Sequence, residues 1–452
     1  MAIYALAPLA LRNTVLLIAS LVFYLFDAGW LIWLLVASIL LNHVVARALP
    51  QLDGSKRDTL FVAGVVLNLA ALLHFKYAGF LWGVAASMLA SAGITIGAAP
   101  QIDLPIGISF FTFQAISYIA DVYTGRIAPA RRLIDFGMYH ALFPQLIAGP
   151  IVRYVEVADA VRKRETTLGA MSEGVCRFCI GLGKKLIIAD TLGAVADPIF
   201  ALPSNEMTFA LAWLGLICYT LQIYYDFSGY SDMAIGLGRM LGFNFPENFN
   251  QPYRSRSITE FWRRWHMTLS RWFRDYVYIP LGGNREGPWR TYRNLMIVFA
   301  LCGLWHGAAS TFLVWGVYHG VLLIAERLYR ERFGDRSGGL LAWATTLLLV
   351  MIGWVFFRCA TLPDAFHFIG VLFGLVQNEG AVWKQSFLNG ERLVVLAIGL
   401  VSALVRFEDY SWRLDGSRVS AAFKSGAALI VFTYAIMLLS FRSFNPFIYF
   451  RF

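Results

Sequence analysis

Apolar runs recur along almost the whole chain, and they constrain its fold more than any other feature. The first run covers residues 14–35 and the last covers residues 425–441. Many of the runs approach the roughly 20 residues that a helix needs to cross a bilayer. Of the 452 residues, 58% are hydrophobic and 15% are charged, whereas soluble domains contain about 25% charged residues. Because backbone polar groups in a bilayer must be paired internally, the runs predict an all-α, polytopic transmembrane protein.

The grouping of these runs predicts about eleven membrane-spanning helices plus re-entrant helices, because several runs are too short or too rich in glycine to cross once. The loops between them are short, so we expect one integral membrane domain over residues 1–452. The first run carries one charge, Asp27, and has no small-residue cleavage site. It is therefore interpreted as a retained span rather than a signal peptide.

The net charge of +10 is distributed in short basic clusters between the apolar runs. This is the pattern of a positive cytoplasmic side that contacts anionic membrane lipids, and we expect no nucleic-acid partner. Cys176 and Cys179 have a C-x-x-C spacing that could serve redox chemistry or a metal, but buried small residues in a helix are the favoured interpretation. The histidines lack a ligand spacing such as H-x-x-x-H, so no metal is expected.

Residues 254–293 differ in kind from the apolar runs, because nine arginines alternate there with tryptophans. Ser257 and Glu260 form a capping-box pattern, which predicts a helix from Ser257 to about Tyr276. On such a helix Trp262, Trp265 and His266 share one apolar stripe, and most arginines lie on the other side. The segment is thus predicted to be an interfacial or re-entrant amphipathic helix.

Two histidines are the strongest candidates for chemistry. His306 lies in an apolar segment between Gly303 and Gly307, where an ionisable group is costly and a close approach by a substrate is possible. His266 lies on the apolar stripe, and a structural role for it remains an equal alternative. Two imidazoles suit acid–base chemistry near neutral pH. His319, thirteen residues after His306, cannot share one site with it unless the helix breaks, so a structural role is favoured.

Asp226 and Asp232 lie six residues apart in a long apolar segment and need partners there. Ion pairs with arginines of the 254–274 helix are the favoured interpretation, and substrate contact by Asp226 is the alternative.

Seven motifs stand out along the chain: Leu104–Gln114, Phe143–Ile151, Tyr225–Asp232, Phe261–Ser270, Tyr278–Asn284, Trp305–Gly307 and Pro446–Phe450. In these motifs the sequence resembles the bacterial branch of the membrane-bound O-acyltransferase family, which includes proteins of alginate O-acetylation and teichoic acid D-alanylation. The resemblance is strongest over about residues 100–325, where the catalytic core is expected. At the end of the chain, Arg451 stands where the family pattern has a glutamine.

The resemblance implies a ring of helices around a central funnel. It implies that His306 is the catalytic histidine and that His266 is a second catalytic residue. The residues predicted to bind substrate are Trp305, Trp265, Arg263, Arg264, Asp226 and Asn284.

The function expected from these features is transfer of an acyl group, acetyl in the first instance, from a cytoplasmic thioester toward an envelope or exopolysaccharide acceptor. The donor is expected to be acetyl-CoA, with an acyl carrier protein as the alternative, and no permanently bound cofactor is expected. An exported or membrane-tethered acyltransferase is the expected partner, and the location is the bacterial inner membrane. The alternative function is a transporter or flippase of a polysaccharide system, which the lack of internal repeats disfavours.

Overall fold

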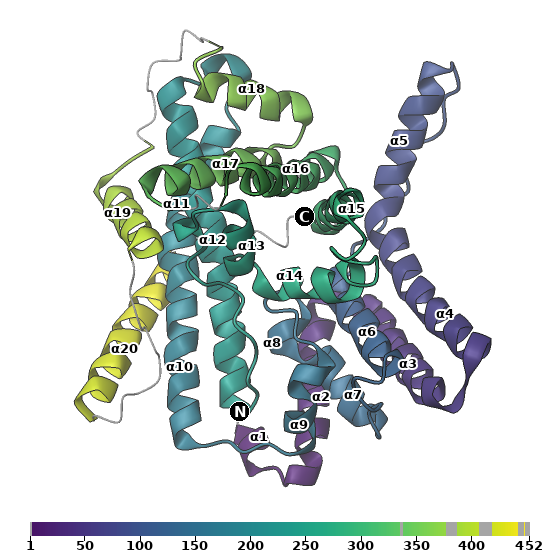
Figure 1. Cartoon of the computed structure of the whole chain (residues 1–452). Helices are drawn as coiled ribbons and strands as arrows, with labels where there is room; N and C mark the ends of the chain where they lie inside the picture. The colour runs from purple at the N-terminus through teal and green to yellow at the C-terminus, as the bar shows by residue number, and fades with distance from the viewer. Residues whose placement is uncertain (1, 335–337, 377–386, 406–417, 442–446, 448–452) are drawn as a thin grey trace. The chain divides into compact units, whose positions relative to one another are not determined.

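The computed structural model describes residues 2–334, 338–376, 387–405, 418–441 and 447, and those segments contain helices but no strand (Figure 1). The all-α prediction is confirmed. The closing motif Pro446–Phe450 and Arg451 lie outside the described residues, apart from Phe447.

The chain divides into two compact units. Unit 1 comprises residues 1–171 and 238–246, and unit 2 comprises residues 172–237 and 247–452. Both histidines of the expected pair, His266 and His306, belong to unit 2. That the chain forms one domain with a catalytic core at about residues 100–325 remains a prediction. That core includes residues of both units.

Unit 1 is built mainly from long apolar helices near the N-terminus. α3 and α4 pack against α6, and α2 packs against α7. Asn42 and Asn68 exchange hydrogen bonds of 3.0 and 2.8 Å between α3 and α4, which satisfies two buried amides. The helices are α1 (Ala2–Leu6), α2 (Leu9–Ala28), η1 (Gly29–Leu31), α3 (Ile32–Ala48), η2 (Leu49–Gln51), α4 (Gly54–Leu72), η3 (Leu73–Tyr77), α5 (Ala78–Ser91), α6 (Ile108–Tyr123), α7 (Leu133–Ala141), α8 (Phe143–Leu146) and α9 (Tyr154–Arg162).

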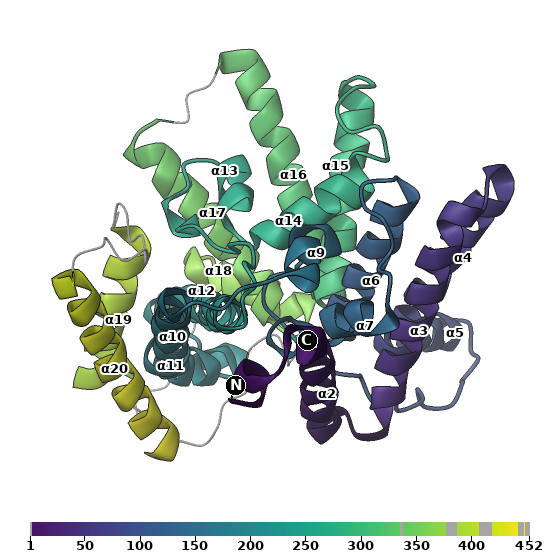
Figure 2. The same cartoon turned by 90° about the horizontal axis from the view of Figure 1, so that it is seen from below.

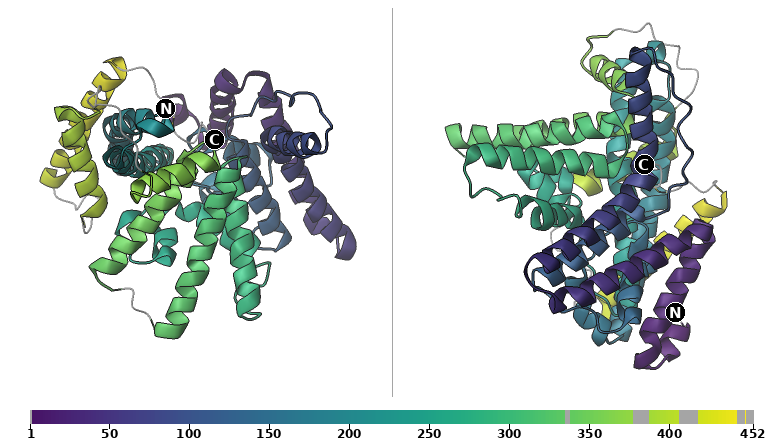
Figure 3. Two further views of the ribbon diagram at one scale, coloured as in Figure 1. Left: turned by 90° about the horizontal axis from the view of Figure 1, so that it is seen from above. Right: turned by 90° about the vertical axis from the view of Figure 1, so that its right-hand side faces the viewer.

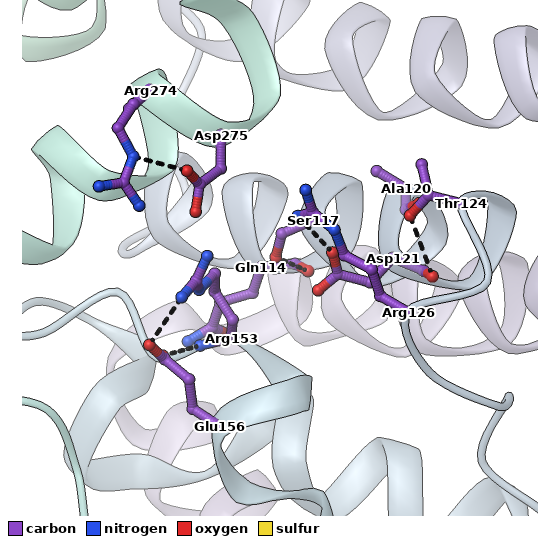
Figure 4. Close-up of polar contacts among 10 residues, drawn as sticks. All are labelled: Gln114, Ser117, Ala120, Asp121, Thr124, Arg126, Arg153, Glu156, Arg274 and Asp275. Atoms are coloured by element: carbon purple, nitrogen blue, oxygen red, sulfur yellow. Dashed lines mark hydrogen bonds and ion pairs between the residues drawn. The ribbon is translucent and has the colours of Figure 1, made fainter. Parts of the chain in front are cut away.

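Charged side chains of unit 1 are paired where its helices end. Figure 4 shows Arg126 beside Asp121 at the end of α6, with a 3.4 Å separation, and Arg153 beside Glu156 at the start of α9, with a 3.0 Å separation. Asp121 is buried, so its pairing with Arg126 offsets the cost of removing a carboxylate from water.

Unit 2 contains the remaining helices, and Figures 2 and 3 show α15, α16 and α17 side by side within it. Two helices, α10 and α12, include residues of both units. The helices are α10 (Leu168–Gly183), η4 (Lys184–Ala189), α11 (Asp190–Phe200), η5 (Ser204–Glu206), α12 (Phe209–Met240), η6 (Pro252–Arg254), α13 (Ile258–Arg264), α14 (Met267–Phe273), η7 (Arg274–Tyr278), α15 (Pro288–His306), α16 (Ser310–Phe333), α17 (Leu340–Arg358), α18 (Leu362–Leu372), α19 (Gly390–Leu404) and α20 (Arg418–Phe441).

Five helical stretches of the described residues are long and apolar enough to cross a membrane. They support a multi-pass membrane protein, while the predicted total of about eleven spans and the central funnel remain predictions. The five stretches are Leu9–Gln51, Gly54–Ser91, Ser310–Phe333, Leu340–Arg358 and Lys424–Phe441.

The arginine-rich segment is not one helix. The predicted start is confirmed, because the Ser257 side chain accepts a 3.0 Å hydrogen bond from the Glu260 backbone N–H and α13 begins at Ile258. The predicted continuation to about Tyr276 is wrong: α13 ends at Arg264, and α14 begins at Met267. Between them His266 has a positive φ of 41°, which the right-handed helix does not allow. The break redirects the side chains that follow it.

Two glycines allow α15 and α16 to cross closely. A Cβ on Gly303 would overlap the carbonyl oxygen of Phe312, and a Cβ on Gly316 would overlap that of Phe299. Only residues without a side chain can occupy such a crossing. The close contact fixes the end of α15, where His306 is the last residue.

Candidate active site

His306 is buried among aromatic rings at the end of α15, with 4% of its surface exposed. Its ring centroid lies 4.9 Å from that of Trp305, 5.0 Å from that of Trp315 and 5.2 Å from that of Phe357. The helix ends there because Gly307 has extended backbone dihedrals. Three rings from three helices therefore hold one imidazole at a helix terminus.

His266 approaches His306 from the break between α13 and α14. It is fully buried, and its ring lies 4.7 Å from Phe227, 5.9 Å from Trp305 and 6.4 Å from His306. At 6.4 Å between ring centroids the two imidazoles cannot hydrogen-bond directly, so a small reacting group could lie between them. The left-handed backbone of a non-glycine residue costs about 1–3 kcal/mol, which the contacts around His266 must offset.

Asn248 holds the His266 ring from the other side. Its Oδ1 accepts hydrogen bonds from the backbone N–H and the hydroxyl of Thr268, at 3.3 and 2.8 Å, and lies 3.1 Å from Nδ1 of His266. Its Nδ2 donates to Oγ of Ser231 at 3.0 Å. A backbone N–H can only donate, so the atom that faces Thr268 must be the amide oxygen.

The orientation of Asn248 determines the tautomer of His266. Because Oδ1 can only accept, Nδ1 of His266 must carry the proton, and Nε2 then carries the lone pair. Burial lowers the pKa of His266 to about 3, because a charged imidazole would lose its hydration. His266 is therefore a neutral ring with an accepting Nε2 at neutral pH.

His319 belongs to the same aromatic cluster as His306. The chain between α15 and α16 turns at Gly307–Ala309, so the helix break that would allow the two histidines to share a site is present. Both rings contact Trp315, with centroid distances of 5.0 Å to His306 and 5.1 Å to His319. The break removes the argument from sequence separation, while the structural role of His319 stays a prediction.

The predicted substrate-binding residues divide between the histidine pair and other places in unit 2. Trp305 lies at the site, in contact with both histidines. Trp265 is buried in a neighbouring aromatic group, 5.0 Å from Phe249 and 4.8 Å from Trp354 between ring centroids. A substrate contact by Trp265 stays a prediction.

The polar members of the predicted set lie away from the histidine rings. Arg263 is exposed and lines a cavity between α13, α14 and α15. Arg264 pairs with Glu260 at 2.8 Å, and Asn284 is exposed in the turn after η7. Their roles in substrate binding remain predictions.

Asp226 and Asp232 have basic partners other than the predicted ones. Lys185 contacts Asp226 at 2.7 Å, and Lys184 and Arg177 each contact Asp232 at 2.6 Å. The predicted pairing with arginines of residues 254–274 is therefore wrong. The basic residues of α10 and η4 are closer because α12 packs against that helical stretch at small residues. A Cβ on Gly181 of α10 would overlap the carbonyl oxygen of Gly229 of α12.

Sequence reasoning missed the residues that orient the histidines. Asn248, Trp315 and Phe357 lie in none of the matching motifs, and Thr268 lies in the Phe261–Ser270 motif without being singled out there. The four residues come from a loop and three helices. Only the folded chain brings them together. Cys176 and Cys179, in contrast, are buried in α10 as expected, packed near Ala428 of α20.

The match to a family model is consistent with this combination of apolar helices and a buried histidine pair. Residues 131–362 match the model of the membrane-bound O-acyltransferase family, and the chain belongs to this family. The range includes both histidines and Asn248.

Similarity to curated proteins extends over the whole chain. It is 41% identical to "Probable alginate O-acetylase AlgI" of Pseudomonas putida, over 100% of this chain and 96% of that protein. It is 37% identical to the peptidoglycan O-acetyltransferase of Helicobacter pylori, over 81% of this chain and 74% of that protein. It is 32% identical to the teichoic acid D-alanyltransferase of Bacillus subtilis, over 54% of this chain and 65% of that protein. The chain is an O-acetyltransferase, and the transporter alternative has no support among these relatives.

Proposed function

We propose that this protein moves an acetyl group from a cytoplasmic thioester across the membrane toward an envelope or exopolysaccharide acceptor. The observation that carries the proposal is the buried pair of His306 and His266, whose rings lie 6.4 Å apart and both contact Trp305. The names of the relatives support acetyl as the group and a cell-envelope polymer as the final acceptor.

The chemistry proposed for the pair follows from the two rings. His306 takes the proton of the acceptor hydroxyl as its oxygen attacks the thioester carbonyl carbon, which forms the new C–O bond. The C–S bond then breaks, and the proton passes from His306 to the leaving sulfur. His266 has its lone pair on Nε2, so it accepts a hydrogen bond from a hydroxyl group that lies between the two rings, which are too far apart to hydrogen-bond directly. It does not donate to the carbonyl.

The proposed donor is acetyl-CoA, with an acetylated acyl carrier protein as the alternative. Both carry phosphate groups, and residues 254–293 contain nine arginines that could bind phosphate or anionic lipid headgroups. By the positive-inside bias this segment faces the cytoplasm. The proposed location is the bacterial inner membrane.

We also propose a partner on the other side of the membrane. The described loops are short, and a polymer chain needs an extended surface to be held. An exported or membrane-tethered acyltransferase would receive the acetyl group and pass it to the polysaccharide. The acyl group itself must cross about 30 Å of hydrocarbon, which requires a continuous path through the helices.

The first experiment tests His306. His306→Ala should insert and fold normally, while acetyl transfer falls by roughly 10²–10⁴-fold, the usual effect of losing a general base. His367→Ala is the matched control, because Nε2 of His367 lies 2.9 Å from the carbonyl oxygen of Ser204 in η5 and its ring lies outside the aromatic cluster. Wild-type transfer by a well-expressed His306→Ala protein contradicts the mechanism.

The second experiment tests the relay. Vesicles that contain this protein alone, with acetyl donor inside and polysaccharide outside, should form no acetylated polysaccharide until the partner is added. Product without a partner would show direct transfer to the polymer.

A further inference from the structure

The carboxylate of Glu326, on α16, caps the start of α13. Its Oε2 accepts hydrogen bonds from the backbone N–H groups of Ile258 and Thr259, at 2.6 and 3.2 Å, and its Oε1 accepts one from the Thr259 hydroxyl at 2.7 Å. Ile258 and Thr259 begin α13, and the first N–H groups of a helix have no carbonyl partner within it. Figure 2 shows the two helices side by side. One carboxylate therefore joins the start of α13 to α16.

Two side chains divide the capping of α13, and they differ in where they come from. Ser257 directly precedes the helix, and its hydroxyl accepts from the backbone N–H of Glu260 at 3.0 Å. Such a local cap stabilises a helix without joining it to another element. Glu326 accepts from the N–H groups of the two preceding residues and belongs to α16. Its hydrogen bonds therefore complete the cap and also fix where α13 begins.

Arg330 holds the Glu326 carboxylate in this position. It lies about one turn further along α16, pairs with Oε1 of Glu326 and donates to the hydroxyl oxygen of Thr259 at 2.8 Å. The side chain of Glu326 is only 15% exposed, and a carboxylate removed from water needs donors around it. Two backbone N–H groups, one hydroxyl and one guanidinium supply them. The contact is thus specific in geometry as well as in charge.

α13 connects this anchor to His266. The helix contains seven residues and ends at Arg264, so it is a rod of about 10 Å. Two residues later His266 has a φ of 41°, and a strained backbone of this kind persists only when its surroundings fix it. Asn248 holds the chain after the break, because its carbonyl accepts from the N–H of Met267 at 2.9 Å. Glu326 holds the helix that precedes the break.

The same helix α16 contacts the ring of His306. Trp315 lies about three turns before Glu326 on α16, and its ring centroid is 5.0 Å from that of His306. α15, which ends at His306, crosses α16 closely at Gly303 and Gly316. Both imidazoles, whose centroids are 6.4 Å apart, are therefore positioned relative to α16.

We propose that Glu326 is a positioning residue for acetyl transfer. By holding the start of α13 on α16, it keeps the ring of His266 at the distance from His306 at which one hydroxyl group fits between them. Displacement of such a group by about 1 Å can lower a rate about 10²-fold. Glu326 acts through α13 and takes no part in bond making or breaking. The inference rests on the proposed function for the roles of the two histidines, and it adds the residue that sets their separation.

Glu326→Leu removes the anchor and keeps a side chain of similar reach. Acetyl transfer by the folded variant, reconstituted with its partner, should fall about 10–100-fold. The backbone amides of residues 258–268 should exchange with deuterated solvent about tenfold faster or more, because two N–H groups lose their acceptor. Glu326→Gln keeps an oxygen that accepts from Ile258 and Thr259, so it should recover most of the rate and of the protection.

The matched control is Glu331→Leu. Glu331 is also an acidic residue of α16, but it pairs with Arg327 at 2.8 Å and its side chain is 50% exposed. Its acetyl transfer and its amide exchange at residues 258–268 should stay within twofold of the wild type. If Glu326→Leu does not fold, Glu326→Asp takes its place, because it keeps the charge and shortens the reach by one methylene. Transfer by Glu326→Asp should fall at least about fivefold, and a wild-type rate would overturn the inference.

A second substitution distinguishes positioning from simple capping. In Ser257→Asp a carboxylate next to α13 accepts from N–H groups of its first turn, but it makes no link to α16. Combined with Glu326→Leu, it should restore much of the lost Tm while acetyl transfer stays low. Recovery of transfer together with Tm would show that Glu326 only caps α13, and the inference would be overturned. Ser257→Asp alone should transfer acetyl within twofold of the wild type.

The outcomes separate this inference from the proposed function. If His306→Ala keeps wild-type transfer, the proposed function is wrong and the inference falls with it. If His306→Ala loses transfer and the folded Glu326→Leu protein keeps the wild-type rate, only the inference is overturned. A slow Glu326→Leu protein whose amides at residues 258–268 stay as protected as in the wild type also overturns it, because α13 is then not displaced.

Discussion

Replacing Asn248 by leucine tests how the neutral tautomer of His266 is maintained. Leucine has nearly the shape of asparagine, but it removes the oxygen that accepts from Nδ1 of His266 and from Thr268. Leaving a buried donor without an acceptor costs about 1–3 kcal/mol. If that loss of about 1–3 kcal/mol falls on the positioning of His266, the rate is roughly 5–150-fold lower, at about 1.4 kcal/mol per factor of ten.

Asn248→Asp distinguishes the effect of the His266 ring orientation on the rate from the effect of packing around residue 248. A carboxylate still accepts from Nδ1, so the tautomer of His266 is kept, but its charge raises the pKa of His266 from about 3. Below the raised pKa the ring is protonated and Nε2 can no longer accept, so the rate of acetyl transfer falls on the acidic side. Above the raised pKa, the rate of acetyl transfer returns toward that of the wild type. In the wild type, protonation of His266 does not limit the rate between about pH 5 and 8.

The assay is transfer of radiolabelled acetyl by the reconstituted protein and its partner, measured across this pH range and divided by the amount of folded protein. Asn294→Leu is the control, because Asn294 is buried and donates to the carbonyls of Leu281 and Gly283. It should lose stability without a change in pH profile. A wild-type rate for Asn248→Leu, or an unshifted profile for Asn248→Asp, would refute the role assigned to Asn248.

Three further predictions concern stability and orientation. Lys185→Met should destabilise the protein by about 3–5 kcal/mol, because it removes the cation that contacts the buried carboxylate of Asp226; in thermal melts Lys185→Met combined with Asp226→Leu should recover much of the loss. Gly316→Leu should prevent the close crossing of α15 and α16, and wild-type stability of this variant would contradict the packing. A cysteine at Arg285 should react with a membrane-impermeant maleimide only after the cells are opened, and labelling of intact cells would reverse the proposed orientation.

His306 could be singled out from the sequence by its local chemistry, while its catalytic role stays a prediction. An ionisable residue in an apolar run is costly wherever the helix lies, so the residue stands out before any packing is known. The same reasoning placed Ser257 correctly as a helix cap, because capping depends on atoms within one turn. It failed for the continuous helix to Tyr276, since the break at His266 depends on the backbone of Asn248, whose carbonyl accepts from Met267 at 2.9 Å.

The sequence by itself determined that the chain is helical and resides in a membrane, because hydrophobicity and its period are properties of each segment. It also singled out His306 and His266 as candidates. Only the tertiary structure decided the partners of Asp226, the tautomer of His266 and the proximity of His319 to Trp315. These depend on contacts between segments far apart in the chain, and one sequence contains no local signal for such contacts. The glycines that let α15 and α16 meet were visible beforehand, but which surfaces they bring together is set by the packing of the whole unit.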